Sequence, residues 1–390
     1  MKRSTVLLGV CVAATVALAG CQDAVTAPPS STPRAQQPST FQPAVLNFGS
    51  LDTGPLSLLA VGPRSDLRAV DFSRAIDPSD YVCTPGSPVI SWLNGEIGRV
   101  AQAGEIAILA ELVNEWAAAD VPVLEAWAFE TPATPQYFGY NGEFTEVVRK
   151  AERDVKHFWA IPSDDIQLLA MHGSVLLDVQ KVSATYQFVF GVPEPFATQF
   201  ATHVRNLVLA APSLNGGNYP YFTFNAVSFP AQLGRPDKIV MGDGVLAGFD
   251  AIGLGDVAPP AIYVHEFAHQ IQFEKGYDND PLATTGSTAE QTRYLELMAD
   301  AFSGYYLTHK RGAAMNRKRV EQFLQIYFQL GDCAFASAGH HGTPNQRLAA
   351  ARFGFTVADE AQKQGHILTP DQFHARFLAY YSTIIAPDAP

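Results

Sequence analysis

The spacing of apolar residues predicts four helices in the first half of the chain. Apolar residues recur every three or four positions over 104–119, 143–158, 164–181 and 196–210. This spacing is typical of a helix that buries one face. Residues 45–100 mix short apolar runs with Gly and Pro, and their pattern predicts no definite element.

The period changes after residue 218. Residues 219–229 are rich in aromatics and alternate with polar residues, and 237–241 form a short apolar run that ends at Gly242-Asp243-Gly244, so both segments predict strands. Helices, a small antiparallel sheet and further helices together predict an α+β fold. We expect a mainly helical N-terminal region at 45–160 and a second domain at 161–390.

The N-terminus has the pattern of a secretion signal. Lys2 and Arg3 precede an apolar stretch, which ends at Leu18-Ala19-Gly20-Cys21. This ending resembles the bacterial lipoprotein signal, in which the cysteine is lipidated and becomes the first residue of the mature chain. We expect a signal peptide at 1–20 and a lipid on Cys21. The alternatives are an ordinary signal cleaved nearby and a short membrane anchor.

The lipid would hold the protein on a membrane outside the cytoplasm, in the bacterial cell envelope, in the periplasm or at the cell surface. Residues 21–44 are rich in Pro, Ser and Thr and poor in large apolar residues, which predicts an extended tether. Cys83 and Cys333 remain in the mature chain. The sequence leaves open whether they form a disulfide.

Composition narrows the class of partner. The chain has 390 residues, of which 47% are hydrophobic and 16% charged, so it can form a substantial core. Its 26 Lys+Arg and 38 Asp+Glu give a net charge of −12. An acidic protein repels a phosphate backbone, and we therefore expect no nucleic-acid partner.

Candidate chemistry begins at His265-Glu266-Phe267-Ala268-His269, an HExxH motif. Pro259 and Gly276 mark the expected start and end of its helix. On that helix His265 and His269 lie one turn apart and can chelate one metal ion, with Glu266 beside them as a base. Because the neighbours are apolar, these polar groups need partners, which a metal would supply. The alternative is a helix with two histidines satisfied in other ways.

A zinc hydrolase needs a third protein ligand and an open fourth position. A second helix is predicted from Ser287, which has capping-box spacing to Glu290. It carries Glu296 and Asp300 four residues apart among apolar residues, where like charges repel. Their placement is explained if Glu296 is the third ligand and Asp300 accepts the free N–H of a ligating histidine. An exposed acidic stripe is the alternative.

Three motifs together resemble the neutral zinc metallopeptidase family of bacteria. The HEFAH segment is followed by Glu296-Leu297-Met298-Ala299-Asp300 and by His341-Gly342-Thr343-Pro344-Asn345-Gln346-Arg347, within about 237–355. Ala268, Met298 and Ala301 depart from the family, which usually has Gly, Gln and Cys there. The resemblance implies a zincin-like core of a small antiparallel sheet plus active-site helices, one zinc ion per chain, and a peptidase domain at 161–390.

Residues and resemblance agree on a mechanism for a polypeptide substrate. Zinc would acidify a water, and Glu266 would take its proton and deliver it to the leaving amine. His341 is the candidate to stabilise the oxyanion, with His340 second; a structural role in the loop is the alternative. Asp332 and Arg347 are expected to orient this segment, for example by pairing with His341 or with each other. The strand at 237–241 could bind an extended peptide by strand addition.

A second class of function stays open, namely a non-catalytic surface lipoprotein whose metal-stabilised domain serves binding or assembly. Glu266 favours catalysis, because a purely structural site does not need it. Structural zinc also more often fills its fourth position with Cys or His.

Overall fold

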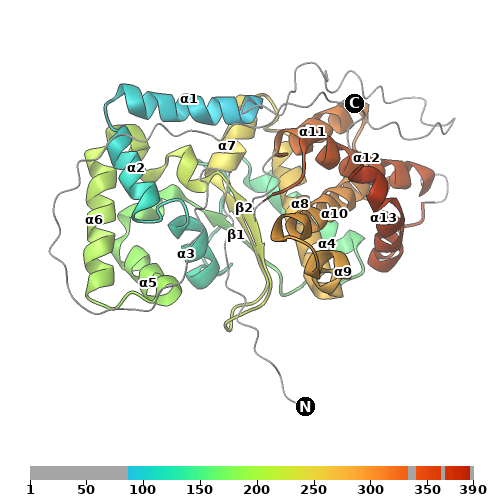
Figure 1. Cartoon of the computed structure of the whole chain (residues 1–390), viewed down its shortest axis with the longest axis horizontal. Helices are drawn as coiled ribbons and strands as arrows, with labels where there is room; N and C mark the ends of the chain where they lie inside the picture. Colours follow the sequence, from blue (N-terminus) through green and yellow to red (C-terminus); the bar gives the residue numbers. More distant parts are fainter. Residues whose placement is uncertain (1–86, 333–339, 362–364, 387–390) are drawn as a thin grey trace, which may run out of the picture.

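The structure is a computed structural model that describes residues 87–332, 340–361 and 365–386. The predicted signal peptide, Cys21, the tether, Cys83 and Cys333 lie outside these residues. A three-stranded sheet stands between two groups of helices (Figure 1). The coarse α+β prediction is confirmed, with helices making up most of the described chain. None of the described helices has the length and apolar character needed to cross a bilayer.

Along the chain, helices precede, separate and follow the three strands. The helices before the second half of the chain are α1 (Pro88–Gln102), α2 (Ile106–Asn114), α3 (Val121–Phe129), α4 (Thr145–Phe158), α5 (Val179–Phe190) and α6 (Phe196–Ala210). The strands are β1 (Gln167–Met171), β2 (Ala226–Phe229) and β3 (Lys238–Gly242). The later helices are α7 (Asp243–Ala251), α8 (Ala258–Lys275), α9 (Pro281–Thr284), α10 (Thr288–Thr308), α11 (Arg317–Gln329), α12 (Pro344–Ala361) and α13 (Pro370–Ile384).

The sheet is mixed, whereas the sequence predicted an antiparallel one. Its strand order is β1-β3-β2, with β1 parallel and β2 antiparallel to the central strand β3. The prediction that 237–241 binds a peptide by strand addition is also wrong. Because β3 has a neighbour on each side, its backbone groups already pair within the sheet.

The predicted helix at 164–181 is wrong as well. Its apolar run is β1, followed by a 3-10 turn at Gly173–Leu177 and then by α5. Leu168 and Ala170 join the core beneath α4 and α8, while Leu169 and Met171 pack with α3 on the other face. A strand with both faces buried reads as a continuous apolar run, which periodicity cannot distinguish from a helix segment.

Several other predictions hold with shifted boundaries. The helices at 143–158 and 196–210 and the strand at 237–241 are confirmed. The helix at 104–119 is confirmed only as α2. Of the strand at 219–229 only β2 forms, because Pro220 begins a 3-10 turn that runs to Thr223. The segment Gly242-Asp243-Gly244 is not a turn after β3 but the start of α7.

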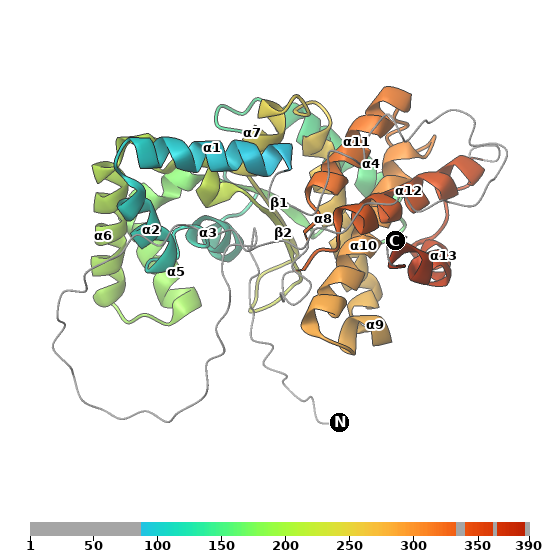
Figure 2. The ribbon, with the colours of Figure 1, turned by 45° about the horizontal axis from the view of Figure 1, so that its top comes forward.

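Helix α8 occupies the middle of the second group of helices. It packs against β2 and β3 on one side and against α4, α10 and α11 on others, while α12 packs along α10. Figure 2 shows α1 crossing above the sheet next to α7, and its Val89 N–H donates to Gln329 Oε1 at the end of α11. The main core continues from α4 through the sheet to α13, so residues on both sides of position 160 share it.

The crossing of α10 and α12 depends on two glycines. A Cβ atom on Gly304 would lie 2.4 Å from the Ala351 carbonyl oxygen, and one on Gly354 would lie 2.1 Å from the Ala301 carbonyl oxygen. These approaches are closer than any real Cβ contact, so the two backbones can touch only because both positions lack a side chain. This crossing fixes α12, which carries Arg347, against α10.

The substitution Gly354→Ala should therefore destabilise the protein by about 1–3 kcal/mol, the usual cost of overpacking. The matched control is Gly98→Ala on α1, where a Cβ would meet nothing within 4 Å. In the control, the better helix propensity of Ala should raise stability by about 0.5–1 kcal/mol. Thermal or urea unfolding measures both; equal effects of the two variants would contradict the close crossing.

Candidate metal centre

Helix α8 presents its two histidines from an almost fully buried position. Pro259 and Pro260 lie in its first turn, and Gly276, with φ of 69°, ends it in the left-handed conformation, as predicted. The side chains of His265 and His269 keep only 9% and 11% exposure. Two hydrogen bonds fix α8 on the sheet: Ser228 Oγ donates to the Glu266 carbonyl, and Gln270 Nε2 donates to the Lys238 carbonyl.

The third predicted ligand comes from α10. Ser287 and Glu290 form the predicted capping box at its N-terminus, and the helix ends at Thr308. Glu296 faces both histidines. Its side chain is 15% exposed, so one side of the group remains open to solvent. The predicted alternative of an exposed acidic stripe does not describe it, because Asp300 is completely buried.

The ligand atoms of the three residues lie close together. The Nε2 atoms of His265 and His269 are 3.2 Å apart, His265 Nε2 lies 3.3 Å from Glu296 Oε2, and His269 Nε2 lies 3.4 Å from Glu296 Oε1. Tetrahedral zinc with bonds of about 2.0–2.1 Å separates its donor atoms by about 3.3–3.4 Å. The buried cluster of His265, His269 and Glu296 can thus hold a metal ion.

The other ring nitrogen of each histidine is held by a fixed acceptor. His265 Nδ1 lies 2.9 Å from Asp300 Oδ1, the contact that the sequence predicted. His269 Nδ1 lies 3.0 Å from Gln272 Oε1, while Gln272 Nε2 donates to the Leu295 carbonyl at 2.7 Å. That second bond fixes the amide with its oxygen toward the ring. With the hydrogen on each Nδ1, the neutral rings would direct both Nε2 lone pairs toward Glu296.

Asp300 is in turn held by Arg347 of α12. The guanidinium donates from Nε and Nη2 to the two Asp300 oxygens at 2.8 and 2.7 Å, and Nη2 lies 3.6 Å from Glu296. The sequence predicted an orienting role for Arg347 toward His341 or Asp332. The described contacts instead place it behind the ligands, where a two-pronged ion pair compensates the buried carboxylate.

The downstream histidines lie around Asp332. One carboxylate oxygen of Asp332 is 2.6 Å from His340 Nδ1; the other accepts from the His341 backbone N–H at 2.8 Å and lies 3.2 Å from its Nδ1. The predicted pairing of Asp332 with His341 is present. His340 has a side-chain exposure of 1%, and His341 one of 29%. Of the two, His341 is the one that an incoming molecule can reach.

The charges in the cluster shift its pKa values strongly. Burial alone would lower the pKa of His265, but hydrogen bonds and charges from Asp300 and Glu296 outweigh burial and raise it to about 10. Burial would raise the pKa of Glu296, but the charges of His269 and His341 and hydrogen bonds from both ligating histidines hold it well below its usual range. The surroundings therefore favour the charged form of each group, protonated His265 and ionised Glu296.

Gln272 supports the site, a role that the sequence did not predict. It stands three residues after His269 and so on the same helix face, a spacing that could have indicated the contact. Glu266, the predicted base, is buried on α8 directly after His265.

No family model, curated protein or solved structure matches this chain.

Metal binding should release protons. Because the raised pKa keeps His265 protonated at neutral pH in the metal-free protein, zinc must displace that proton, and affinity should rise about tenfold per pH unit between pH 7 and 9. Calorimetric titration with zinc in buffers of different ionisation enthalpy measures the release at each pH. A histidine with an ordinary pKa near 6.5 would release almost none at pH 8, and that result would contradict the electrostatics described here.

The Gln272→Ala variant should bind zinc about 10–100-fold more weakly, because His269 loses the acceptor that fixes its ring. Gln270→Ala is the matched control: it removes a buried amide of the same helix that bonds to strand carbonyls instead of a histidine. We expect the control to lower the melting temperature but to keep the zinc affinity. Competition with a chromophoric chelator measures both affinities, and similar losses in the two variants would remove Gln272 from the site.

Proposed function

We propose that this protein is a zinc-dependent metallopeptidase that hydrolyses peptide bonds with Glu266 as general base. The observation that carries the proposal is the cluster of two histidine Nε2 atoms and the Glu296 carboxylate. The other ring nitrogens of the two histidines face Asp300 and Gln272. Two imidazoles and one carboxylate are a ligand set of catalytic zinc, in which a fourth position stays open. The partial exposure of Glu296 and His341 supports such an opening.

A zinc ion bound there would supply an acidified water and polarise the scissile carbonyl. Glu266 takes the proton of the attacking water and later passes it to the leaving amine. Its position next to His265 on a rigid buried helix keeps the carboxylate beside the ligands. It also acts electrostatically on His269, whose pKa it helps to raise against the larger opposing effect of burial.

His341 is proposed to stabilise the oxyanion. Asp332 accepts from its Nδ1 and its backbone N–H, so Nε2 can donate a hydrogen bond to the oxyanion when the ring is protonated. The charge of His341 lowers the pKa of Glu296 after the larger effects of burial and His269, so the imidazole lies within electrostatic reach of the ligands. His340, which is buried, is proposed to brace Asp332.

The zincin-like core, the neutral zinc metallopeptidase family and the envelope location belong to the same proposal. They rest on the motifs at 265–269, 296–300 and 341–347 and on the N-terminal segment that ends at Cys21. Anchored through a lipid at Cys21, the enzyme would act on polypeptides outside the cytoplasm.

The deciding experiment compares the wild type with Glu266→Gln in the full chain, purified without chelator or histidine tag. Both should hold about one zinc per chain by elemental analysis, and His265→Ala should hold almost none. Cleavage of a quenched-peptide library should fall by about 10²–10⁴ in Glu266→Gln, the usual contribution of a general base. The matched control Glu274→Gln changes another glutamate of α8 and should keep wild-type activity.

Two results would count against the proposal in different ways. Full activity of Glu266→Gln would refute the base. Stoichiometric zinc without cleavage of any peptide would favour the alternative, a surface protein whose metal-stabilised domain serves binding or assembly.

A further inference from the structure

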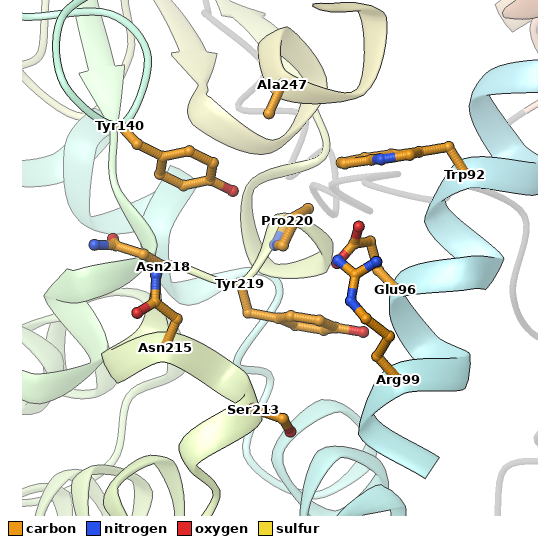
Figure 3. A pocket seen from close by; sticks show the side chains of 10 residues that line it. All are labelled: Trp92, Glu96, Arg99, Tyr140, Ser213, Asn215, Asn218, Tyr219, Pro220 and Ala247. Atoms are coloured by element: carbon orange, nitrogen blue, oxygen red, sulfur yellow. The ribbon is translucent and has the colours of Figure 1, made fainter. Parts of the chain in front are cut away.

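A cavity lies away from the metal centre, between α1, α7 and the segment 213–220. It has a volume of about 470 Å³, within the range of sites for small molecules. None of the residues that line it belongs to the ligand cluster or to its supports (Figure 3). The proposed peptidase activity leaves this cavity without a role.

Aromatic rings form much of the wall. Trp92 comes from α1, Tyr140 from the loop before α4, and Tyr219 from the loop after α6 (Figure 3). Flat aromatic surfaces bind the C–H faces of ring-shaped molecules, and their polar edges can still form hydrogen bonds.

The hydroxyl of Tyr219 is the feature that points to a ligand. The residue is only 3% exposed, and its hydroxyl has no hydrogen-bond partner among the described residues. Figure 3 shows the ring extending along the cavity toward Arg99. Burial raises the pKa of Tyr219, so the group stays a neutral phenol that can donate and accept. A buried hydroxyl without a partner is unfavourable, and a bound molecule with hydroxyl groups would satisfy it.

The polar side of the cavity is built by an unusual backbone. Asn215, Gly216 and Gly217 follow one another with φ of 47°, 61° and 90°. Gly217 approaches Gly173 so closely that a Cβ would lie 2.4 Å from the Gly173 carbonyl oxygen. This packing holds the segment in the left-handed region and places Asn215 and Asn218 among the residues that line the cavity (Figure 3). Each amide offers both donors and an acceptor.

The lining carries no net charge. Glu96 and Arg99 are the charged residues that line the cavity, and they pair with each other on α1. A charged ligand would therefore meet no unpaired opposite charge. Neutral hydroxyl groups, which both donate and accept, suit two amides and a phenol better than an anion or a cation does.

We propose that this cavity binds a neutral sugar ring, with a C–H face against the aromatic wall and a hydroxyl group on Tyr219. The site is independent of the metal centre, so it would stand even if the peptidase proposal failed.

The test uses the full chain in detergent, titrated by calorimetry with methyl glucoside, cellobiose and diacetylchitobiose. At least one should bind with a Kd of about 10 mM or tighter. Tyr219→Phe should weaken that binding about threefold to tenfold, as expected for one lost hydrogen bond, without lowering the melting temperature of the sugar-free protein.

Tyr263→Phe is the matched control, because it removes another fully buried hydroxyl without a partner, on α8, outside the cavity. It should leave sugar affinity unchanged. The proposal is overturned if no sugar binds at about 10 mM, or if Tyr219→Phe binds sugar as well as the control does. Binding of benzyl alcohol at the cavity without any sugar binding would overturn it too, since the wall would then select an apolar ring.

Discussion

The candidate site depends on the close approach of His265, His269 and Glu296, which all direct proton-accepting atoms into one buried space. Asp300 and Gln272 face the outer ring nitrogens of His265 and His269, so the inner nitrogens face each other 3.2 Å apart, and the raised pKa of His265 places a proton among them in the metal-free protein. The carboxylate of Glu296 adds negative charge at nearly the same distance. A buried arrangement of this kind is stable only around a cation, whether a proton or a metal ion.

The residues behind the ligands hold the ligand side chains in this arrangement. Leu295, whose carbonyl orients Gln272, precedes Glu296 in α10, so the helix that supplies the third ligand also fixes the tautomer of His269. Arg347 donates to both oxygens of Asp300 and thereby holds the carboxylate in place beside His265. Because Arg347 comes from α12, its reach depends on the glycine crossing of α10 and α12. The site is therefore a property of three helices and not of the HExxH motif alone.

The sequence was informative where the chemistry is local to one helix. The spacing of His265 and His269, the capping box at Ser287, and the i,i+4 pair of Glu296 and Asp300 are all set within single helices, and the structure brings their side chains together. The role of Arg347 could not be derived in this way, because its partner lies on another helix and the choice between Asp300 and Asp332 depends on packing. The apolar run of β1 was misread for a related reason: its burial on both faces comes from α3, α4 and α8, which periodicity does not show.

The two proposed sites lie on different helices that follow the same strand. Strand β3 leads directly into α7, which lines the cavity through Ala247, and α8 follows α7 in the chain and carries the histidines. A molecule in the cavity would contact α1 and α7 but would leave α10 and α12 untouched, and these supply Glu296, Asp300 and Arg347. Coupling between two sites requires an element with two arrangements that both sites bias. The contacts that hold α8 to the sheet and to α10 involve none of the residues that line the cavity. A sugar in the proposed cavity should therefore leave the proposed chemistry at the metal centre unchanged.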